Sequence, residues 1–168
     1  MFDHPEANGL SSSGIKLFSG VPTPILALIG KACVWHRLAS NEIVVDSESP
    51  GPHGVFFLVE GRAEVLKHGP DNQLMAVAKL NAPDCFGEFG AITGKRGSAS
   101  IRTETDCVLA EISSERFMSL LNACPSASLC LLEKIVALVK NLGEDSVLLQ
   151  SADSALEIAH RNADLRSL

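Results

Sequence analysis

The sequence lacks the features that would place the protein outside a reducing compartment. Its five cysteines (33, 85, 107, 124 and 130) form no C-x-x-C pair, and an odd, scattered set favours buried or free thiols over a disulfide framework. There is no run of eighteen apolar residues, and residues 1–4 are too polar and acidic for a signal peptide. We therefore expect a cytoplasmic protein with no membrane partner.

Positive charge is also scarce. Fourteen Lys and Arg stand against twenty Asp and Glu, which gives a net charge of −6. Proteins that bind a phosphate backbone normally carry a basic face, so we expect no nucleic-acid partner. The apolar share of 46% is sufficient for a buried core in a chain of 168 residues.

Composition divides the chain into three stretches. Residues 1–14 are polar and end in a Gly/Ser-rich run, which predicts a flexible tail. Residues 15–150 carry regular apolar periodicity and are predicted to form one domain. Residues 151–168 are predicted to be a C-terminal helical extension.

Residues 35–112 contain short apolar runs separated by turn residues about every ten positions. This pattern predicts six strands, at residues 42–46, 55–59, 62–67, 73–80, 98–103 and 108–112. Glu60 and Gly61 predict a tight hairpin, because glycine readily adopts positive φ. No helix long enough for parallel α/β winding separates the strands, so a sandwich or barrel is expected.

Helices are predicted on both sides of this β region. Before it, apolar residues recur at helical spacing after Thr23, a predicted N-cap, with Pro24 at the first helical position. After it, Ser113 and Ser114 open one helix with a hydroxyl cap, and a longer helix begins after Pro125. The longer helix is consistent with either a lid over a ligand pocket or a dimer interface.

No catalytic or metal-binding motif is complete. Gly94 and Lys95 match the end of a P-loop, but Arg96 replaces the hydroxyl residue that would hold Mg²⁺. The five histidines show neither H-x-H nor H-x-x-x-H spacing, and no Ser, His and acid grouping forms a recognisable nucleophile elbow. We therefore predict that the protein is not an enzyme and uses no metal or cofactor.

One segment, residues 86–103, combines the features of a phosphate site. Gly87 and Glu88 open a short predicted helix, whose first N–H groups and the loop amides of Ser98 and Ala99 would form an anion nest. A carboxylate beside an anion is unfavourable unless the ligand also offers hydroxyl groups, as a phosphorylated sugar does. Nearby basic residues are Lys95, Arg96 and Arg102.

The segment resembles the phosphate-binding cassette of cyclic nucleotide-binding domains, as in bacterial catabolite activators and kinase regulatory subunits. The family pattern is F-G-E-[LI]-x-[LI]-[LI], a short loop, then P-R-x-A-[ST]-V-x-A. The chain reads F-G-E-F-G-A-I from residue 86, then T-G-K, then R-G-S-A-S-I-R-T from residue 96. The likeness spans roughly residues 15–150. It implies an antiparallel β jelly roll (a double-stranded β-helix) with N-terminal helices and a C-terminal lid or dimer helix.

The resemblance implies a ligand site made of six residues: Gly87, Glu88, Phe89, Arg96, Ser98 and Ala99. The family carboxylate that accepts the ribose 2′-hydroxyl falls on Glu88. The backbone amides that bind the cyclic phosphate fall on Gly87, Ser98 and Ala99. The hydroxyl at Ser98 occurs in members of both base preferences and does not select the base.

The chain departs from the family at the phosphate arginine. That arginine aligns with Gly97, and Arg96 occupies the family's proline position. Arg96 stands one residue early, and the freedom of Gly97 would let its guanidinium reach the phosphate. A lost arginine–phosphate contact would cost about 1.5–3 kcal/mol, or about tenfold to a hundredfold in affinity.

From this resemblance we expect a regulatory, signal-transducing module that binds a 3′,5′-cyclic nucleotide, with cAMP slightly favoured over cGMP. Movement of the C-terminal helix would be the output, and a homodimer through that helix or an effector protein would be the partner. One alternative is a degenerate cassette that serves as a dimerisation or docking module without nucleotide. Another is a related sensor of haem or redox state.

Overall fold

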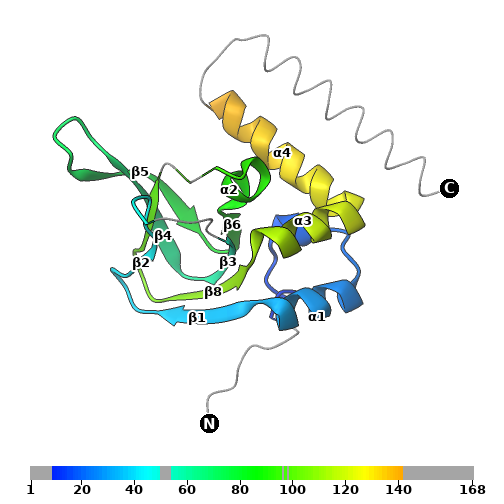
Figure 1. Ribbon diagram of the computed structural model, residues 1–168. Coiled ribbons are helices and arrows are strands. Elements are labelled where there is room, and N and C mark those ends of the chain that lie inside the picture. The colour runs from blue at the N-terminus through cyan, green and yellow to red at the C-terminus, as the bar shows by residue number, and fades with distance from the viewer. Residues whose placement is uncertain (1–8, 50–53, 96, 98, 142–168) are drawn as a thin grey trace. The chain divides into compact units, whose positions relative to one another are not determined.

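The computed structural model describes residues 9–49, 54–95, 97 and 99–141, coloured in Figure 1. The described residues divide into two compact units: those within 9–16 and 22–119 form one, and residues 17–21 with 120–141 form the other. The elements in chain order are η1 (Lys16–Phe18), α1 (Thr23–Ala32), β1 (Val34–Leu38), β2 (Ile43–Val45), β3 (Val55–Glu60), β4 (Arg62–His68), β5 (Leu74–Asn81), β6 (Asp84–Phe86), α2 (Glu88–Thr93), β7 (Ser100–Thr103), β8 (Cys107–Ile112), α3 (Ser114–Ala123) and α4 (Pro125–Asn141).

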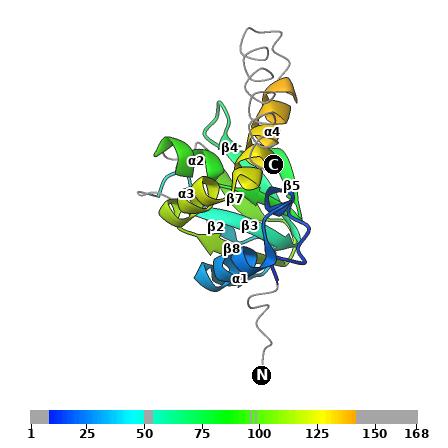
Figure 2. The same ribbon diagram turned by 90° about the vertical axis from the view of Figure 1, so that its right-hand side faces the viewer.

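The strands of the first unit form two antiparallel four-stranded sheets (Figures 1 and 2). One sheet has the order β1-β8-β3-β6 and the other has the order β2-β7-β4-β5. Most neighbouring strands are distant in the sequence, so the chain crosses repeatedly between the sheets. This jelly-roll-like arrangement with flanking helices confirms the predicted fold class.

Both sheets contribute to one core. Its buried members alternate along the strands with period two, as expected for strands that bury one face. They are Val45, Phe56, Leu58, Ala63, Phe86, Ile101, Cys107 and Leu109. The rings of Phe56 and Phe86 stack with centroids 5.2 Å apart. In β3 the intervening residues Val55 and Phe57 are also fully buried, so this strand is apolar on both faces, and α1 packs beside β8.

All six predicted strands are present, with bounds shifted by at most two residues. Two further strands, β1 and β6, were not predicted. In β1 polar His36 and Arg37 interrupt the apolar alternation, and only Cys33 separates the strand from α1. β6 has three residues, too few to show a period.

The helix starts agree with the sequence except at α1. Thr23 is not its N-cap: Pro22 occupies that position, no side chain caps the helix, and Pro24 is the second helical residue. The hydroxyl cap of α3 is confirmed, because the Arg116 N–H donates to Ser113 Oγ over 3.4 Å. The predicted start of the longer helix at residue 125 is also confirmed.

The predicted ends of the chain are described only in part. Residues 1–8 and the predicted extension at 151–168 lie outside the described residues. In the described end of the predicted tail, Leu10 is buried and the Ser13 hydroxyl donates to the Leu10 carbonyl over 2.8 Å. This part is therefore more ordered than its Gly/Ser-rich composition indicated.

The cysteine side chains form no disulfide bonds. All five cysteines are free, as expected from their spacing. Burial raises the pKa of the Cys33 thiol to about 12.

Within the described residues, no single helix has the length and apolar character needed to cross a membrane. By those two criteria alone the bent pair of α3 and Pro125–Leu138 passes, with 111° between its parts.

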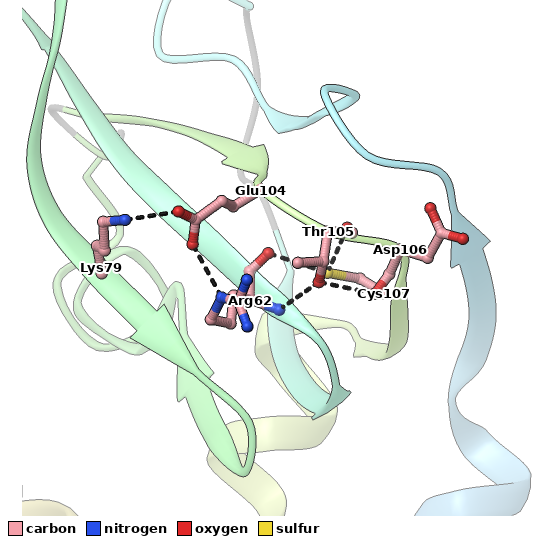
Figure 3. A network of polar contacts seen from close by, with 6 residues as sticks. All are labelled: Arg62, Lys79, Glu104, Thr105, Asp106 and Cys107. Atoms are coloured by element: carbon pink, nitrogen blue, oxygen red, sulfur yellow. Dashed lines mark hydrogen bonds and ion pairs between the residues drawn. The ribbon is translucent and has the colours of Figure 1, made fainter.

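A polar network joins the β3–β4 turn to the β7–β8 turn (Figure 3). Glu104 accepts hydrogen bonds from Lys79 Nζ at 2.5 Å and from Arg62 Nε at 3.1 Å. Thr105 Oγ1 accepts the Arg62 backbone N–H at 3.0 Å, and Cys107 Sγ donates to the Arg62 carbonyl at 3.2 Å. These bonds tie two turns that are about forty residues apart in the sequence.

The network predicts a loss of stability in acid. The hydrogen bonds from Lys79 and then Arg62 hold the pKa of Glu104 below its ordinary value of 4.5. Its stabilising contribution is therefore complete above pH 4.5 and is lost as the pH falls through the lower folded-state pKa. We expect Glu104→Gln to be less stable than wild type at pH 7, with the gap closing towards pH 3. Denaturant unfolding across this range measures it.

The exposed acid Glu115 provides the matched control for this prediction. Glu115→Gln should change stability little at either pH. A gap between wild type and Glu104→Gln that stayed constant from pH 7 to pH 3 would contradict the assignment of the effect to this carboxylate.

Candidate ligand-binding cassette

The site begins at a glycine turn between β6 and α2. Gly87 adopts φ 88° and ψ −5°, the left-handed region that favours glycine. A Cβ on Gly87 would lie 2.5 Å from the Gly54 carbonyl oxygen, so space also excludes other residues. The Ala91 N–H donates to the Gly87 carbonyl at 3.2 Å and closes the first turn of α2. The predicted short helix at this position is confirmed.

Glu88 is the first residue of α2, and it is buried. Only 3% of it is exposed, although acids are rarely buried to this extent. The acid in the first turn of α3, Glu115, is by contrast exposed. A favourable interaction with the helix dipole applies to both residues, so it does not account for the burial of Glu88.

The structure places four of the six predicted site residues. Gly87 and Glu88 lie at the start of α2, Phe89 follows them and is 45% exposed, and Ala99 precedes β7 and is partly buried. Arg96 and Ser98 lie outside the described residues. The exposed side chains of Phe89 and Ile92 give α2 an apolar outer face.

The part of the cassette that leads into β7 is hydrogen-bonded to the rest of the first unit through Ser47 and Ser100. The sequence analysis did not identify these two serines. Ser100 Oγ accepts the Ser47 N–H at 3.0 Å, and the two hydroxyl oxygens lie 3.1 Å apart. Ser100 is buried and directly follows Ala99. The bond therefore fixes the start of β7 beside the predicted phosphate amide. No local pattern indicates a contact between residues 53 positions apart.

The nearby basic residues differ in their surroundings. Arg102 Nη2 lies 2.9 Å from Glu64 Oε2, across the β4–β7 pair. Its neighbour Ile101 belongs to the core, so Arg102 faces outward, as its place in the strand alternation predicts. The Arg102 guanidinium therefore pairs with Glu64 on the outer face of the sheet and does not point towards the core. Lys95 is exposed after α2.

Gly97, which aligns with the family arginine, is exposed and lies in open space. Apart from its chain neighbours, the nearest described atom to a Cβ on Gly97 would be the Ala99 carbonyl oxygen, at 4.0 Å. Its φ lies outside the left-handed region. Neither backbone geometry nor packing against described residues therefore requires glycine at this position.

In the part of the chain that the structure describes, no group of three or more His, Cys, Asp or Glu residues is arranged to hold a metal ion. The chemistry of the site is that of its backbone amides and one carboxylate. Such a set can bind an anion that also carries hydroxyl groups.

Comparison with known proteins agrees with this geometry. The family model described as "Cyclic nucleotide-binding domain" matches residues 35–124, which is more than half of the chain and includes the whole cassette. The chain therefore belongs to the cyclic nucleotide-binding domain family, which confirms the resemblance seen in the sequence.

Three similar proteins show how widely this fold is used. The cAMP-activated global transcriptional regulator CRP of Haemophilus influenzae is 24% identical over 137 residues, which cover 81% of this chain and 61% of that protein. The sensor domain of the transcriptional regulator DNR from Pseudomonas aeruginosa has a TM-score of 0.67 at 18% identity, covering 83% of this chain and 94% of that domain. The regulatory subunit of a cAMP-independent protein kinase A from Trypanosoma brucei has a TM-score of 0.62 at 14% identity, covering 86% and 48%.

The chain thus spans about three fifths of the length of the Haemophilus regulator. At these identities the two solved structures show the fold alone. One of them is the regulatory subunit of a protein kinase A that is described as cAMP-independent, so the fold alone does not establish cAMP as the ligand.

Proposed function

We propose that the chain is a regulatory module that binds a 3′,5′-cyclic nucleotide in the cassette at residues 86–103. The cyclic phosphate would be bound by the backbone amides of Gly87, Ser98 and Ala99, and the ribose 2′-hydroxyl by the carboxylate of Glu88. The observation that carries the proposal is the burial of Glu88 directly after the left-handed turn at Gly87.

The chemistry of the ligand matches these groups. A cyclic phosphate carries one negative charge, which suits backbone N–H groups at the start of a short helix and in a loop. The adjacent ribose offers a hydroxyl donor to an ionised carboxylate, and such a charge-assisted hydrogen bond is stronger than a neutral one. A free phosphate offers the anion without a ribose hydroxyl group that could donate to Glu88.

The preferred ligand and the output are inferences from the family. We infer cAMP as the slightly preferred nucleotide, supported by the cAMP-activated Haemophilus relative. Binding would shift the position of the C-terminal helices, and that shift would be transmitted to a second copy of the chain or to an effector protein. The family's sequence relatives include transcriptional regulators rather than enzymes, so we propose a non-catalytic role.

A second candidate function is a dimerisation or docking module that binds no nucleotide. Gly97 in place of the family arginine favours it, because the strongest phosphate ligand of the family is missing at that position.

Calorimetric titration with cAMP and with cGMP distinguishes the two functions. We expect a Kd at or below about 10 μM for at least one nucleotide, equivalent to about 7 kcal/mol of binding free energy. Glu88→Ala should weaken binding by about tenfold to a hundredfold, because a hydrogen bond to a charged group contributes about 1.5–3 kcal/mol. Glu115→Ala, which removes the exposed first-turn acid of α3, is the matched control and should bind as wild type.

An absence of binding heat with both nucleotides at millimolar concentration would contradict the nucleotide-sensing function and favour the docking module. Equal affinities for wild type and Glu88→Ala would show instead that nucleotide binds without the proposed ribose contact.

A further inference from the structure

A hydrogen-bonded pair of side chains, His36 and Glu111, joins β1 to β8. His36 Nε2 in β1 lies 2.8 Å from Glu111 Oε2 in β8. The side chains are 33% and 34% exposed, so both are partly removed from water. A pair that is exposed to this extent contributes little to the stability of a fold. The role of this pair is therefore sought in its position relative to neighbouring residues.

The Glu111 side chain lies directly against the backbone of Gly54, at the start of β3. A Cβ on Gly54 would lie 3.1 Å from both Cγ and Oε1 of Glu111, and 2.6 Å from the Ile112 carbonyl oxygen. Gly54 is therefore enclosed by the β8 backbone and by the carboxylate that His36 holds in place. A side chain larger than hydrogen would displace one of them.

Gly54 in turn contacts the cassette. Its carbonyl oxygen is the atom that would lie 2.5 Å from a Cβ on Gly87, and Val55 Cα would lie 3.5 Å from the same point. Three close contacts therefore connect His36, Glu111, Gly54 and Gly87. The last of these is the turn that sets the direction of α2 and of Glu88.

We propose that the His36–Glu111 pair is a positioning element for the ligand cassette. By holding the Glu111 carboxylate against Gly54, His36 keeps the Gly54 carbonyl oxygen in contact with Gly87. The peptide groups of Gly87 and Glu88 are thereby fixed in the orientation that the ligand requires. The consequence for ligand affinity rests on the proposed function, whereas the consequence for the Gly87 turn does not.

The first test measures nucleotide affinity. Removing the Glu111 side chain leaves space beside Gly54, so we expect Glu111→Ala to weaken binding by about threefold to thirtyfold. Glu111→Gln fills the same space and keeps an acceptor for His36, so it should retain wild-type affinity within about twofold. Glu64→Ala, which breaks the Arg102–Glu64 pair on the outer face of the other sheet, is the matched control and should bind as wild type.

The second test needs no ligand. The Ala91 amide donates to the Gly87 carbonyl, so its hydrogen exchange reports on the integrity of the turn. In ligand-free protein, Glu111→Ala should speed exchange at Ala91 by at least about threefold relative to β4 and β5 amides, whereas Glu64→Ala should not. Thermal unfolding of each variant identifies a general loss of stability. If Glu111→Ala unfolds, His36→Ala, which removes the partner of the Glu111 carboxylate, should speed exchange at Ala91 in the same way.

The outcomes separate the two proposals. If wild type binds neither nucleotide but exchange at Ala91 changes as expected, the proposed function fails and the positioning role stands. If Glu111→Ala is folded and leaves exchange at Ala91 unchanged, the positioning role is overturned, whatever the affinity of the cassette.

Discussion

Replacing Gly97 by arginine is expected to raise the affinity for cyclic nucleotide by about tenfold to a hundredfold. The substitution restores the guanidinium that the family places at this position. Arginine matches a phosphate with two parallel charge-assisted hydrogen bonds, which lysine cannot reproduce. A Cβ at Gly97 would lie 4.0 Å from the nearest described atom outside its chain neighbours, the Ala99 carbonyl oxygen, and the backbone is not left-handed, so neither feature opposes a side chain at this position.

Calorimetry of wild type, Gly97→Arg and Gly97→Gln measures this effect. Glutamine adds a Cβ and a polar chain without the charge, so it isolates the contribution of the guanidinium and should leave affinity near that of wild type. If Gly97→Arg folds and binds no more tightly than Gly97→Gln, the phosphate does not lie next to this position.

Gly61→Ala is expected to destabilise the fold by about 3 kcal/mol or more. Gly61 adopts φ 93°, a conformation that side chains other than hydrogen rarely accept. A Cβ there would clash with the Asp106 carbonyl oxygen and lie 2.7 Å from Cys107 Sγ. Neither atom belongs to the far end of a flexible side chain, so the two turns would have to separate and disturb the network around Arg62.

Equilibrium denaturation of Gly61→Ala and Gly97→Ala provides the comparison. Both substitutions reduce the conformational entropy of the unfolded chain alike. Only Gly61 has positive φ and close neighbours, so Gly97→Ala should change the free energy of unfolding by less than about 1 kcal/mol. Equal effects at the two positions would show that the turn at Gly61 relaxes to accept a side chain.

The sequence predicts the sheet elements well wherever local chemistry determines them. The β3–β4 hairpin carries a glycine at the point where φ is positive, so its position could be recognised from Glu60 and Gly61 between two apolar runs. β1 could not be recognised, because its half-exposed polar residues are stabilised by pairing with β8, which lies about seventy residues further along the chain. Thr23 resembled an N-cap by residue type, yet Pro22 occupies the cap.

The candidate site shows the same division. Gly87 and Glu88 belong to a continuous motif, so the short helix that they open could be predicted from local sequence. Ser47 meets Ser100 only after β2 pairs with β7, and Gly54 meets Gly87 only because β3 lies beside β6. Such contacts depend on which strands become neighbours, and no spacing along the chain encodes that choice.

The open position at Gly97 also has a consequence for how this module can change over generations. A glycine codon becomes an arginine codon by one base substitution at its first position. Because neither the backbone conformation nor a described neighbour requires glycine at position 97, no compensating mutation is expected to be needed. If Gly97→Arg raises nucleotide affinity as expected, a lineage carrying this chain can change that affinity in one mutational step, in either direction.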